Sequence, residues 1–180
     1  MTTRTGSGPV RVFSVDDVRA AVATVNDPEY PDVSIVDLGL VVDVDVDPTD
    51  GTARVGLIPT FSGCPALRMI ADDVRAAVET VPGVRRCDVD WLDAPVWDTT
   101  RMSPSAHARL SDDYTVVVRR DDGSLHCPVC GSDAVGDRAM AGPTRCRSVA
   151  WCDDCRNPVE VMRTSVVVDA AVPVTIGAAR

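Results

Sequence analysis

The chain has 180 residues and a formal net charge of −9 at pH 7, with 45% hydrophobic but only 4% aromatic residues. This length fits one domain of ordinary size, or a compact domain with a small module, and the core must be packed largely from aliphatic side chains. The acidic balance argues against nucleic acid as a partner, because binding to phosphates requires a basic patch.

The N-terminal residues lack the apolar segment of a signal peptide. The apolar stretch at 165–179 is too short to span a bilayer and contains Asp169 and Pro173. We therefore expect a cytoplasmic protein that does not enter the membrane. Seven cysteines in that compartment indicate metal binding or redox chemistry rather than a disulfide framework.

Residues 13–92 are predicted to form a small domain of helices and strands. A helix is expected over 14–25, where Ser14 can cap the first turn and Asp17 completes a partial capping box. Strand signal then begins at 34–38. The run at 39–48 alternates valine with aspartate, which predicts a strand with one buried face.

The turn sequence PTDG leads from that strand into a second one at 52–58, so the two form an antiparallel hairpin. A second helix is expected over 65–81, where five apolar residues recur at helical spacing before a Pro-Gly pair. A third strand follows at 84–92, with Cys87 on its apolar face. The predicted order is helix, strand, strand, helix, strand.

Two further segments differ in composition from this domain. Residues 93–124 are turn-rich and contain proline and tryptophan, which predicts a linker with a short helix at 105–112. Residues 164–180 are predicted to form a C-terminal tail. Between them, residues 125–163 form a module that is dense in cysteine.

Two Cys-x-x-Cys pairs, 21 residues apart, define this module. The four cysteines are Cys127, Cys130, Cys152 and Cys155. Four thiolates can surround one tetrahedral Zn²⁺, and ligation worth roughly 10–16 kcal/mol would stabilise a module too poor in large apolar residues to fold alone. The spacing predicts a structural zinc ribbon. It favours zinc over iron or an iron–sulfur cluster, and a redox pair would need a βαβ setting that is absent.

Two other cysteines have open interpretations. Cys146 either packs inside the ribbon or joins a metal site. Cys64 stands in the stretch SGCP, and we expect it at the N-cap of the second helix with Pro65 at the first helical position. The free amides and the dipole of a helix N-terminus would stabilise a Cys64 thiolate. A buried cysteine that only packs at a helix start is the alternative.

Three motifs together resemble the signature of the α/β domain of iron–sulfur cluster assembly and carrier proteins. They are DPEYP at 27–31, SIVDLGLV at 34–41 and TFSGCP at 60–65. Residues 13–163 resemble, more closely, the D subunits of bacterial phenylacetyl-CoA epoxidase (ring 1,2-monooxygenase) systems. In those subunits this domain is followed by a Pro/Trp segment and a four-cysteine ribbon.

The resemblance implies an α+β fold and an accessory or maturation role in phenylacetate catabolism, without enzymatic activity of its own. It matches Cys64 to a functional thiolate, Asp27 and Glu29 to an acidic pair, and the four ribbon cysteines to metal ligands. Cys146 falls on a further cysteine of the ribbon pattern. The implied cofactors are structural zinc and a transient iron–sulfur cluster or iron. The implied partners are the oxygenase components, above all the iron–sulfur reductase, and a homodimer is left open.

Two other functions compete with maturation. In the first, Cys64 only packs and the chain is a non-catalytic zinc-binding scaffold that stabilises the multicomponent oxygenase. In the second, the chain is a thiol-dependent hydrolase. Only His107 and His126 could then act as the base, and neither has a clear aspartate partner in the sequence, which disfavours this function.

Overall fold

The computed structural model describes residues 12–120 and 122–163. The helices are α1 (Val15–Val22), α2 (Leu67–Val78) and α3 (Pro104–Asp112), with a 3₁₀ turn η1 at Thr99–Arg101. The strands are β1 (Asn26–Asp27), β2 (Tyr30–Ser34), β3 (Val41–Asp47), β4 (Thr52–Leu57), β5 (Arg86–Trp91), β6 (Val116–Val117), β7 (Val135–Ala139), β8 (Arg147–Cys152) and β9 (Pro158–Met162). None of the helices in these described ranges has the length and apolar character needed to cross a membrane.

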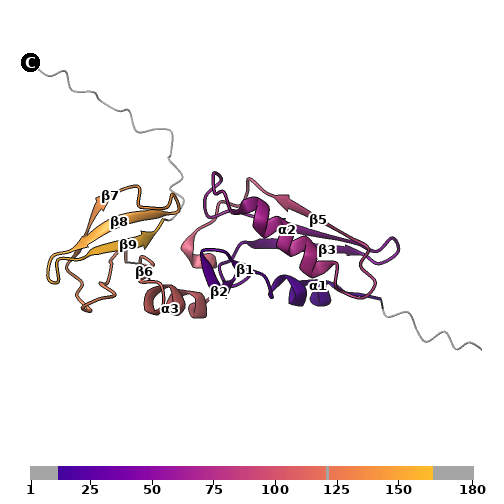
Figure 1. Cartoon of the computed structure of the whole chain (residues 1–180), viewed down its shortest axis with the longest axis horizontal. Helices are drawn as coiled ribbons and strands as arrows, with labels where there is room; N and C mark the ends of the chain where they lie inside the picture. Colours follow the sequence, from indigo (N-terminus) through magenta and orange to yellow (C-terminus); the bar gives the residue numbers. More distant parts are fainter. Residues whose placement is uncertain (1–11, 121, 164–180) are drawn as a thin grey trace, which may run out of the picture.

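Two lobes lie end to end in the elongated molecule (Figure 1). We call the part built from α1, α2 and β1 to β5 the α/β lobe, and the sheet β6 to β9 with its loops the ribbon lobe. The α/β lobe has a two-stranded sheet, β1-β2, and a three-stranded sheet with the order β3-β4-β5. The sheet of the ribbon lobe has the order β6-β9-β8-β7. The predicted α+β class, with a small mixed domain followed by a four-cysteine ribbon, is confirmed.

Helix α1 begins with the predicted capping box. Asp17 donates its backbone N–H to Ser14 Oγ at 3.2 Å, and Ser14 donates its own N–H to Asp17 Oδ2 at 3.0 Å. These two bonds satisfy amides that have no partner within the helix. The cap sets the start of the helix, and Val18 and Val22 then lie buried on one face.

The three-stranded sheet follows from the alternation of valine and aspartate. Strands β3 and β4 pair antiparallel, with Val44 opposite Val55 on the buried face and Asp45 opposite Arg54 on the other. Strand β5 then pairs parallel to β4, because α2 carries the chain across one face of the sheet before it returns. The predicted hairpin and both later elements are therefore present.

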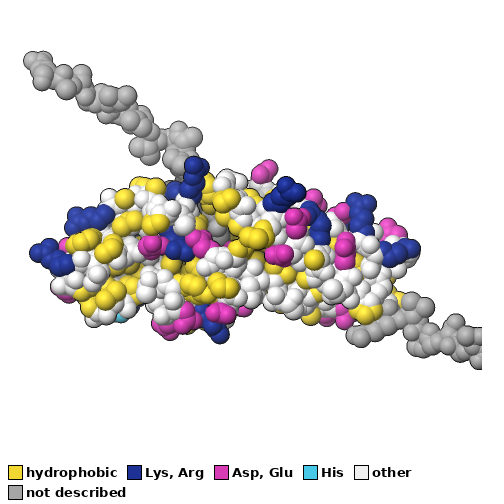
Figure 2. All heavy atoms as spheres, viewed as in Figure 1, with side chains coloured by type: hydrophobic (Ala, Val, Ile, Leu, Met, Phe, Trp, Pro, Cys, Tyr) yellow, Lys and Arg dark blue, Asp and Glu magenta, His cyan; other side chains and the backbone are white. Residues whose placement is uncertain are grey.

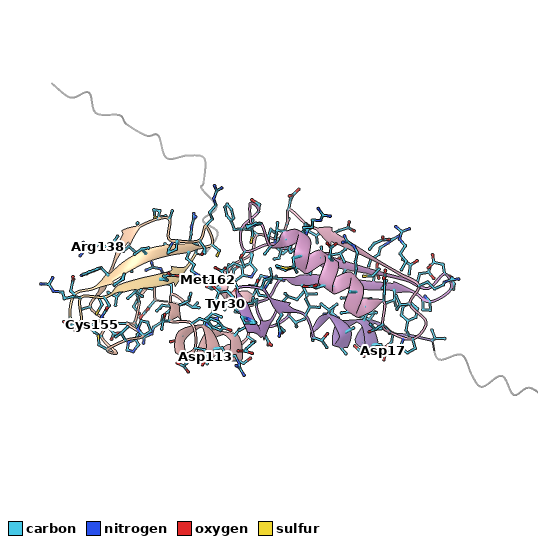
Figure 3. The ribbon with its side chains drawn as sticks, in the orientation of Figure 1. Asp17, Tyr30, Asp113, Arg138, Cys155 and Met162 are labelled. Carbon is cyan, nitrogen blue, oxygen red and sulfur yellow. The ribbon has the colours of Figure 1, made fainter. Side chains whose placement is uncertain are left out.

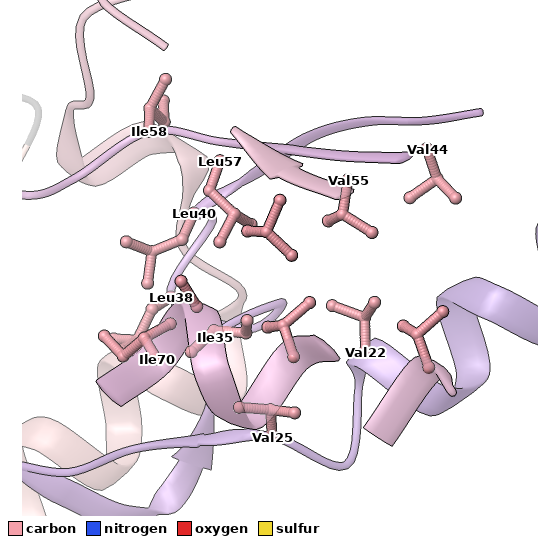
Figure 4. Packing of buried hydrophobic residues seen from close by; sticks show 14 of the residues in the cluster. Val22, Val25, Ile35, Leu38, Leu40, Val44, Val55, Leu57, Ile58 and Ile70 are labelled. Carbon is pink, nitrogen blue, oxygen red and sulfur yellow. The ribbon is translucent and has the colours of Figure 1, made fainter. Parts of the chain in front are cut away.

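The main core lies between this sheet and the helices that cover it (Figure 4). Its aliphatic side chains come from α1, α2, the strands and the turn before β3. The labelled members include Val22, Val25, Ile35, Leu38, Leu40, Val44, Val55, Leu57, Ile58 and Ile70. The composition of the chain predicts such a core, since aliphatic residues far outnumber aromatic ones.

The strand signal at 34–38 is wrong beyond Ser34, which ends β2, because residues 35–39 form a turn. Ser34 Oγ accepts the N–H of Asp37 at 3.0 Å and donates to the Asp37 carboxylate at 2.9 Å, which closes the turn. Gly39 follows with φ +73°, and a Cβ there would lie 2.4 Å from the carbonyl oxygen of Arg101. Ile35 and Leu38 thus fill the core from a turn that only glycine can complete, while Val36 is 40% exposed.

Residues 97–117 connect the two lobes through buried contacts. Trp97 is 1% exposed and donates its indole N–H to the carbonyl of Leu38 at 2.8 Å. Helix α3, expected at 105–112, is capped by Ser103 and buries Leu110. Strand β6 then pairs parallel to β9 in the ribbon sheet. This segment therefore packs against the α/β lobe and ends inside the ribbon lobe.

Candidate metal centre and thiol pocket

Four cysteine sulfurs of the ribbon lobe converge on one point. The ligand atoms of Cys127, Cys130, Cys152 and Cys155 all lie within 4.8 Å of one another. The Sγ atoms of Cys127 and Cys155 are 3.6 Å apart, as are those of Cys130 and Cys152. This is too long for a disulfide, whereas tetrahedral ligands about 2.3 Å from a zinc ion stand about 3.8 Å apart. The donor set therefore fits a closed four-thiolate metal site.

The two Cys-x-x-Cys pairs adopt the same backbone turn. The first cysteine of each pair donates its N–H to a carbonyl five residues later, from Cys127 to Ser132 at 2.8 Å and from Cys152 to Asn157 at 3.0 Å. Each first cysteine also accepts the N–H of the residue after the second cysteine, at 3.0 Å in both turns. That residue is left-handed in both cases, with φ +77° at Gly131 and +61° at Arg156.

We expect Arg156→Gly to stabilise the ribbon lobe by about 0.5–1 kcal/mol. A side chain in the left-handed region costs roughly 1–2 kcal/mol, part of which glycine loses again through its freer unfolded chain. Hydrogen exchange of the ribbon amides in the metal-loaded protein measures the change. The matched control is Gly131→Ala, which should destabilise, since a Cβ there meets only His126 at 3.8 Å and the strain comes from φ alone.

Interactions around the metal site shift the pKa values of two of its thiols in opposite directions. At Cys130 a backbone hydrogen bond from Ser132 lowers the pKa, but desolvation and the three neighbouring thiols outweigh it and raise the pKa to about 12. Asn157 donates its side-chain amide to Cys155 Sγ at 3.4 Å and lowers the pKa of this thiol to about 6. His126, the residue directly before Cys127, lies outside the quartet and contacts Asp133 Oδ1 through Nδ1 at 3.0 Å. Figure 3 shows Cys155 at the end of the ribbon lobe that faces away from Tyr30 and Met162, which lie at the junction with the α/β lobe.

Cys64 lies before helix α2 but not at its cap. The N-cap residue is Ala66, which makes no side-chain capping bond, and the carbonyl of Cys64 accepts the N–H of Leu67 at 3.4 Å. A turn at 64–67 thus separates the thiol from the first helical residue. The prediction that Cys64 caps the helix, with Pro65 as its first residue, is wrong, because the cap is Ala66 and the helix begins at Leu67.

The half-buried Cys64 lines a cavity of about 710 Å³ at the junction of the lobes. Three chain segments form the cavity: the β1–β2 turn, the loop before α2, and the loop between β7 and β8 in the ribbon lobe. Its residues include Glu29, Phe61, Cys64, Pro65, Pro143 and Cys146. The cavity therefore contains two thiols from different lobes, one carboxylate and an apolar lining.

The predicted acidic pair divides between two tasks. Glu29 lines the cavity, and its Oε2 accepts a hydrogen bond from Cys146 Sγ at 3.5 Å. Asp27 shapes the turn instead, since its carboxylate accepts the N–H of Glu29 at 2.8 Å and burial raises its pKa. Burial, with the nearby carboxylate of Glu29, also raises the pKa of the Cys146 thiol.

Arg147 fastens the ribbon lobe to the β1–β2 turn. Its guanidinium forms ion pairs with Glu29 at 3.1 Å and with Glu160, and donates to the Tyr30 hydroxyl at 3.0 Å. It also lies over the Tyr30 ring, 5.2 Å from the centroid, and that ring meets Tyr114 edge to face at 5.1 Å. These contacts fix the loop that carries Cys146, the residue directly before Arg147.

The other candidate residues of the sequence lie elsewhere. Cys87 is buried in the core of the α/β lobe, as its strand position predicts. His107 contacts the carbonyl of Thr99 through Nε2 at 3.1 Å. Neither histidine of the chain is among the residues that line the cavity with Cys64.

The surface of the two lobes differs in character. On the face seen in Figure 2, hydrophobic side chains gather over the ribbon lobe and the junction, while acidic ones gather over α3 and are spread over the α/β lobe. Val129 and Met140 of the ribbon lobe are 59% and 70% exposed. Single apolar side chains are also exposed on the α/β lobe, where Met69 is 50% exposed.

Both lobes match known family models. Residues 15–91 match the model described as an iron-sulfur cluster assembly protein, and residues 111–163 match the one described as a PaaD zinc beta ribbon domain. An Escherichia coli protein, named as the D subunit of a "Putative 1,2-phenylacetyl-CoA epoxidase", is 30% identical over 156 residues. The match covers 83% of this chain and 92% of that protein, so it includes both lobes.

Two further matches are confined to about half of the chain. A Porphyromonas gingivalis protein named "Fe-S protein maturation auxiliary factor" is 40% identical over 95 residues, which cover 53% of this chain and 89% of that protein. The crystal structure of a domain of unknown function from Bacillus anthracis is 36% identical, with a TM-score of 0.50, and covers 53% of this chain and 90% of that one.

Proposed function

Because the chain belongs to the family that joins an iron–sulfur cluster assembly domain to a PaaD zinc β-ribbon, we propose that it matures the iron–sulfur centre of a phenylacetyl-CoA epoxidase system. The family role is that of an accessory assembly factor rather than of an enzyme. The client that we propose is the component of the epoxidase that carries the iron–sulfur cluster, its reductase.

The position of Cys64 carries this proposal. The thiol is half-buried at a cavity, in the lobe that matches iron–sulfur assembly proteins. A thiolate is the protein ligand that iron–sulfur clusters use, and a cavity gives the cargo both an entrance and shelter from water. We therefore assign transient cargo binding to Cys64, with Glu29 beside it in the cavity and Asp27 shaping the turn that presents Glu29.

The metal that we propose for the quartet is zinc, with a structural role. Cys127, Cys130, Cys152 and Cys155 would hold it as a closed site that supplies folding energy. In this proposal the quartet binds a permanent structural ion, whereas Cys64 binds the cargo transiently. The exposed Val129 and Met140 support a role of the ribbon lobe in docking the client.

We expect Cys64→Ser to abolish maturation while leaving the chain folded and its ribbon metal in place. The thiolate is lost but the half-buried serine keeps the local shape, so stability should change little. The measurement is the iron content and activity of the epoxidase reductase when it is produced together with the variant. Cys87→Ser is the control, since Cys87 is buried away from the cavity.

A fully active reductase with Cys64→Ser, and a deficient one without the chain, would reject cargo transfer. That result would leave the chain as a scaffold of the oxygenase complex. The metal content of the purified chain distinguishes the two functions in a second way, because a scaffold would hold one zinc ion and no labile iron.

A further inference from the structure

The cavity at the junction is built from both lobes, and each lobe contributes one thiol. Cys64 comes from the loop before α2, and Cys146 from the loop that follows β7 in the ribbon lobe, 82 residues later in the sequence. Both residues line the same space of about 710 Å³. This volume lies within the range of about 300–1,000 Å³ that is typical of pockets for small ligands and cofactors.

Cys146 is held in a defined place. It is 9% exposed, its Sγ lies 3.2 Å from Thr144 Oγ1, and it donates to Glu29 Oε2 at 3.5 Å. Glu29 is in turn fixed by its ion pair with Arg147. The hydrogen-bond partner of Cys146 thus comes from the α/β lobe and not from the ribbon core. The side chain of Cys146 therefore faces the cavity, which Glu29 also lines.

The spacing of the possible ligands indicates whether the cargo is a single ion or a cluster. Among the described residues, only the ribbon quartet brings three or more Cys, His, Asp or Glu ligand atoms around one point. Cys64, Cys146 and Glu29 do not do so, although they line one cavity. Ligands around a single ion must converge, whereas those of an iron–sulfur cluster bind different iron atoms and stand further apart.

We propose that Cys64 and Cys146 are ligands of one iron–sulfur cluster, held at the junction so that the two lobes share its ligation. This inference rests on the proposed function only in assigning iron cargo to Cys64. Glu29 is a positioning residue that keeps Cys146 turned toward the cavity. The apolar lining from Phe61, Pro65 and Pro143 shields the cluster.

Two protein thiolates leave the cluster with open ligand positions, since clusters are usually held by four. Open ligand positions allow transfer of the cluster, because a client cysteine can bind iron before the carrier sulfurs dissociate from it. Each carrier thiol releases one proton to solvent when its sulfur binds iron. On transfer, each client thiol loses a proton as it binds, each carrier sulfur regains one, and the oxidation states of iron and sulfide are unchanged.

The test is anaerobic reconstitution of the full zinc-loaded chain with ferric iron, sulfide and a thiol that reduces part of the iron. Iron, acid-labile sulfide, zinc and visible absorption are measured for the wild type and for Cys146→Ser, Cys64→Ser and Cys87→Ser. We expect the wild type and Cys87→Ser to bind a cluster. Cys64→Ser and Cys146→Ser should each lose it while retaining zinc.

The outcomes separate this inference from the proposed function. A cluster retained by Cys146→Ser but lost by Cys64→Ser would overturn the shared site and leave the role of Cys64 standing. Retention by both variants would overturn both. Uptake of iron without sulfide would show that the cargo is a single ion and would also overturn the cluster.

A second measurement needs no variant and so does not depend on the folding of Cys146→Ser. Cysteine alkylation by iodoacetamide is read by mass spectrometry in the wild type, before and after reconstitution. We expect the cluster to protect Cys64 and Cys146 together, while the labelling of Cys87 stays the same. Protection of Cys64 alone contradicts the shared site.

Discussion

Removal of the ribbon metal is expected to unfold the ribbon lobe and to leave the α/β lobe folded. Within the described residues, the core cluster of the ribbon contains only seven buried residues, two of which are the ligands Cys127 and Cys152, whereas the main cluster contains 27. So small a core cannot offset the entropy of its chain, and ligation at roughly 10–16 kcal/mol supplies the difference. Hydrogen exchange with a chelator present should show loss of protection confined to the ribbon strands.

The sharpest variant for this prediction is Cys130→Ser. Cys130 is the exposed member of the quartet, so serine there removes a ligand with little loss of packing. Cys64→Ser is the control, because it removes a half-buried thiol outside the quartet. Added zinc should restore protection to the chelated wild type. Unchanged protection of the ribbon strands in the metal-free protein would show that they fold without the ion.

Replacement of Arg147 by Met should lower the free energy of unfolding by about 2 kcal/mol and loosen the junction of the lobes. The Arg147 side chain is only 13% exposed and, within the described ranges, is the sole cation that forms ion pairs with Glu29 and Glu160. Loss of one partner from a fully buried pair costs about 3–5 kcal/mol. The effect here is smaller because the two carboxylates are 37% and 33% exposed and solvent screens them.

Urea unfolding followed by tryptophan fluorescence measures this change. The matched control is Arg138→Met, on the neighbouring strand β7, whose pair with Asp153 is 59% and 63% exposed. A pair so exposed contributes about 0–1 kcal/mol. Equal losses in the two variants would mean that the Arg147 contacts add nothing beyond an ordinary surface pair.

The elements that could be predicted from the sequence have signals that lie close together along the chain. The Ser14–Asp17 box marks the start of α1, and the alternation of valine with aspartate marks β3. The turn at 35–39 could not be predicted in this way. Its apolar residues look like a strand, but Trp97 and Arg101 donate to its carbonyls from 59 and 62 residues further along the chain.

The same distinction between local sequence signals and long-range contacts applies to the candidate sites. The quartet could be predicted because the two-residue spacing within each pair is itself a geometric requirement of the metal. Cys146 and Glu29 are 117 residues apart in the sequence. No local sequence pattern predicts that the β7–β8 loop will contact the β1–β2 turn. The cap expected at Cys64 is wrong because a Cys-Pro pair fits both a helix cap and the turn that precedes one. The functional roles of Cys64, Asp27, Glu29 and Cys146 stay predictions, as does the division of the chain at residues 93, 125 and 164. The predicted tail at 164–180 lies outside the residues that the structure describes.

One wall of the cavity comes from the β7–β8 loop, and this has a physiological consequence. With zinc as the proposed ribbon metal, a cell starved of zinc would still make an intact α/β lobe, but the chain would lack the part of the cavity wall that carries Cys146. If Cys64 and Cys146 share the ligation of a cluster, as we propose, such a chain would not hold the cluster at a complete site. The supply of zinc would in this way control whether the chain can bind its proposed iron cargo.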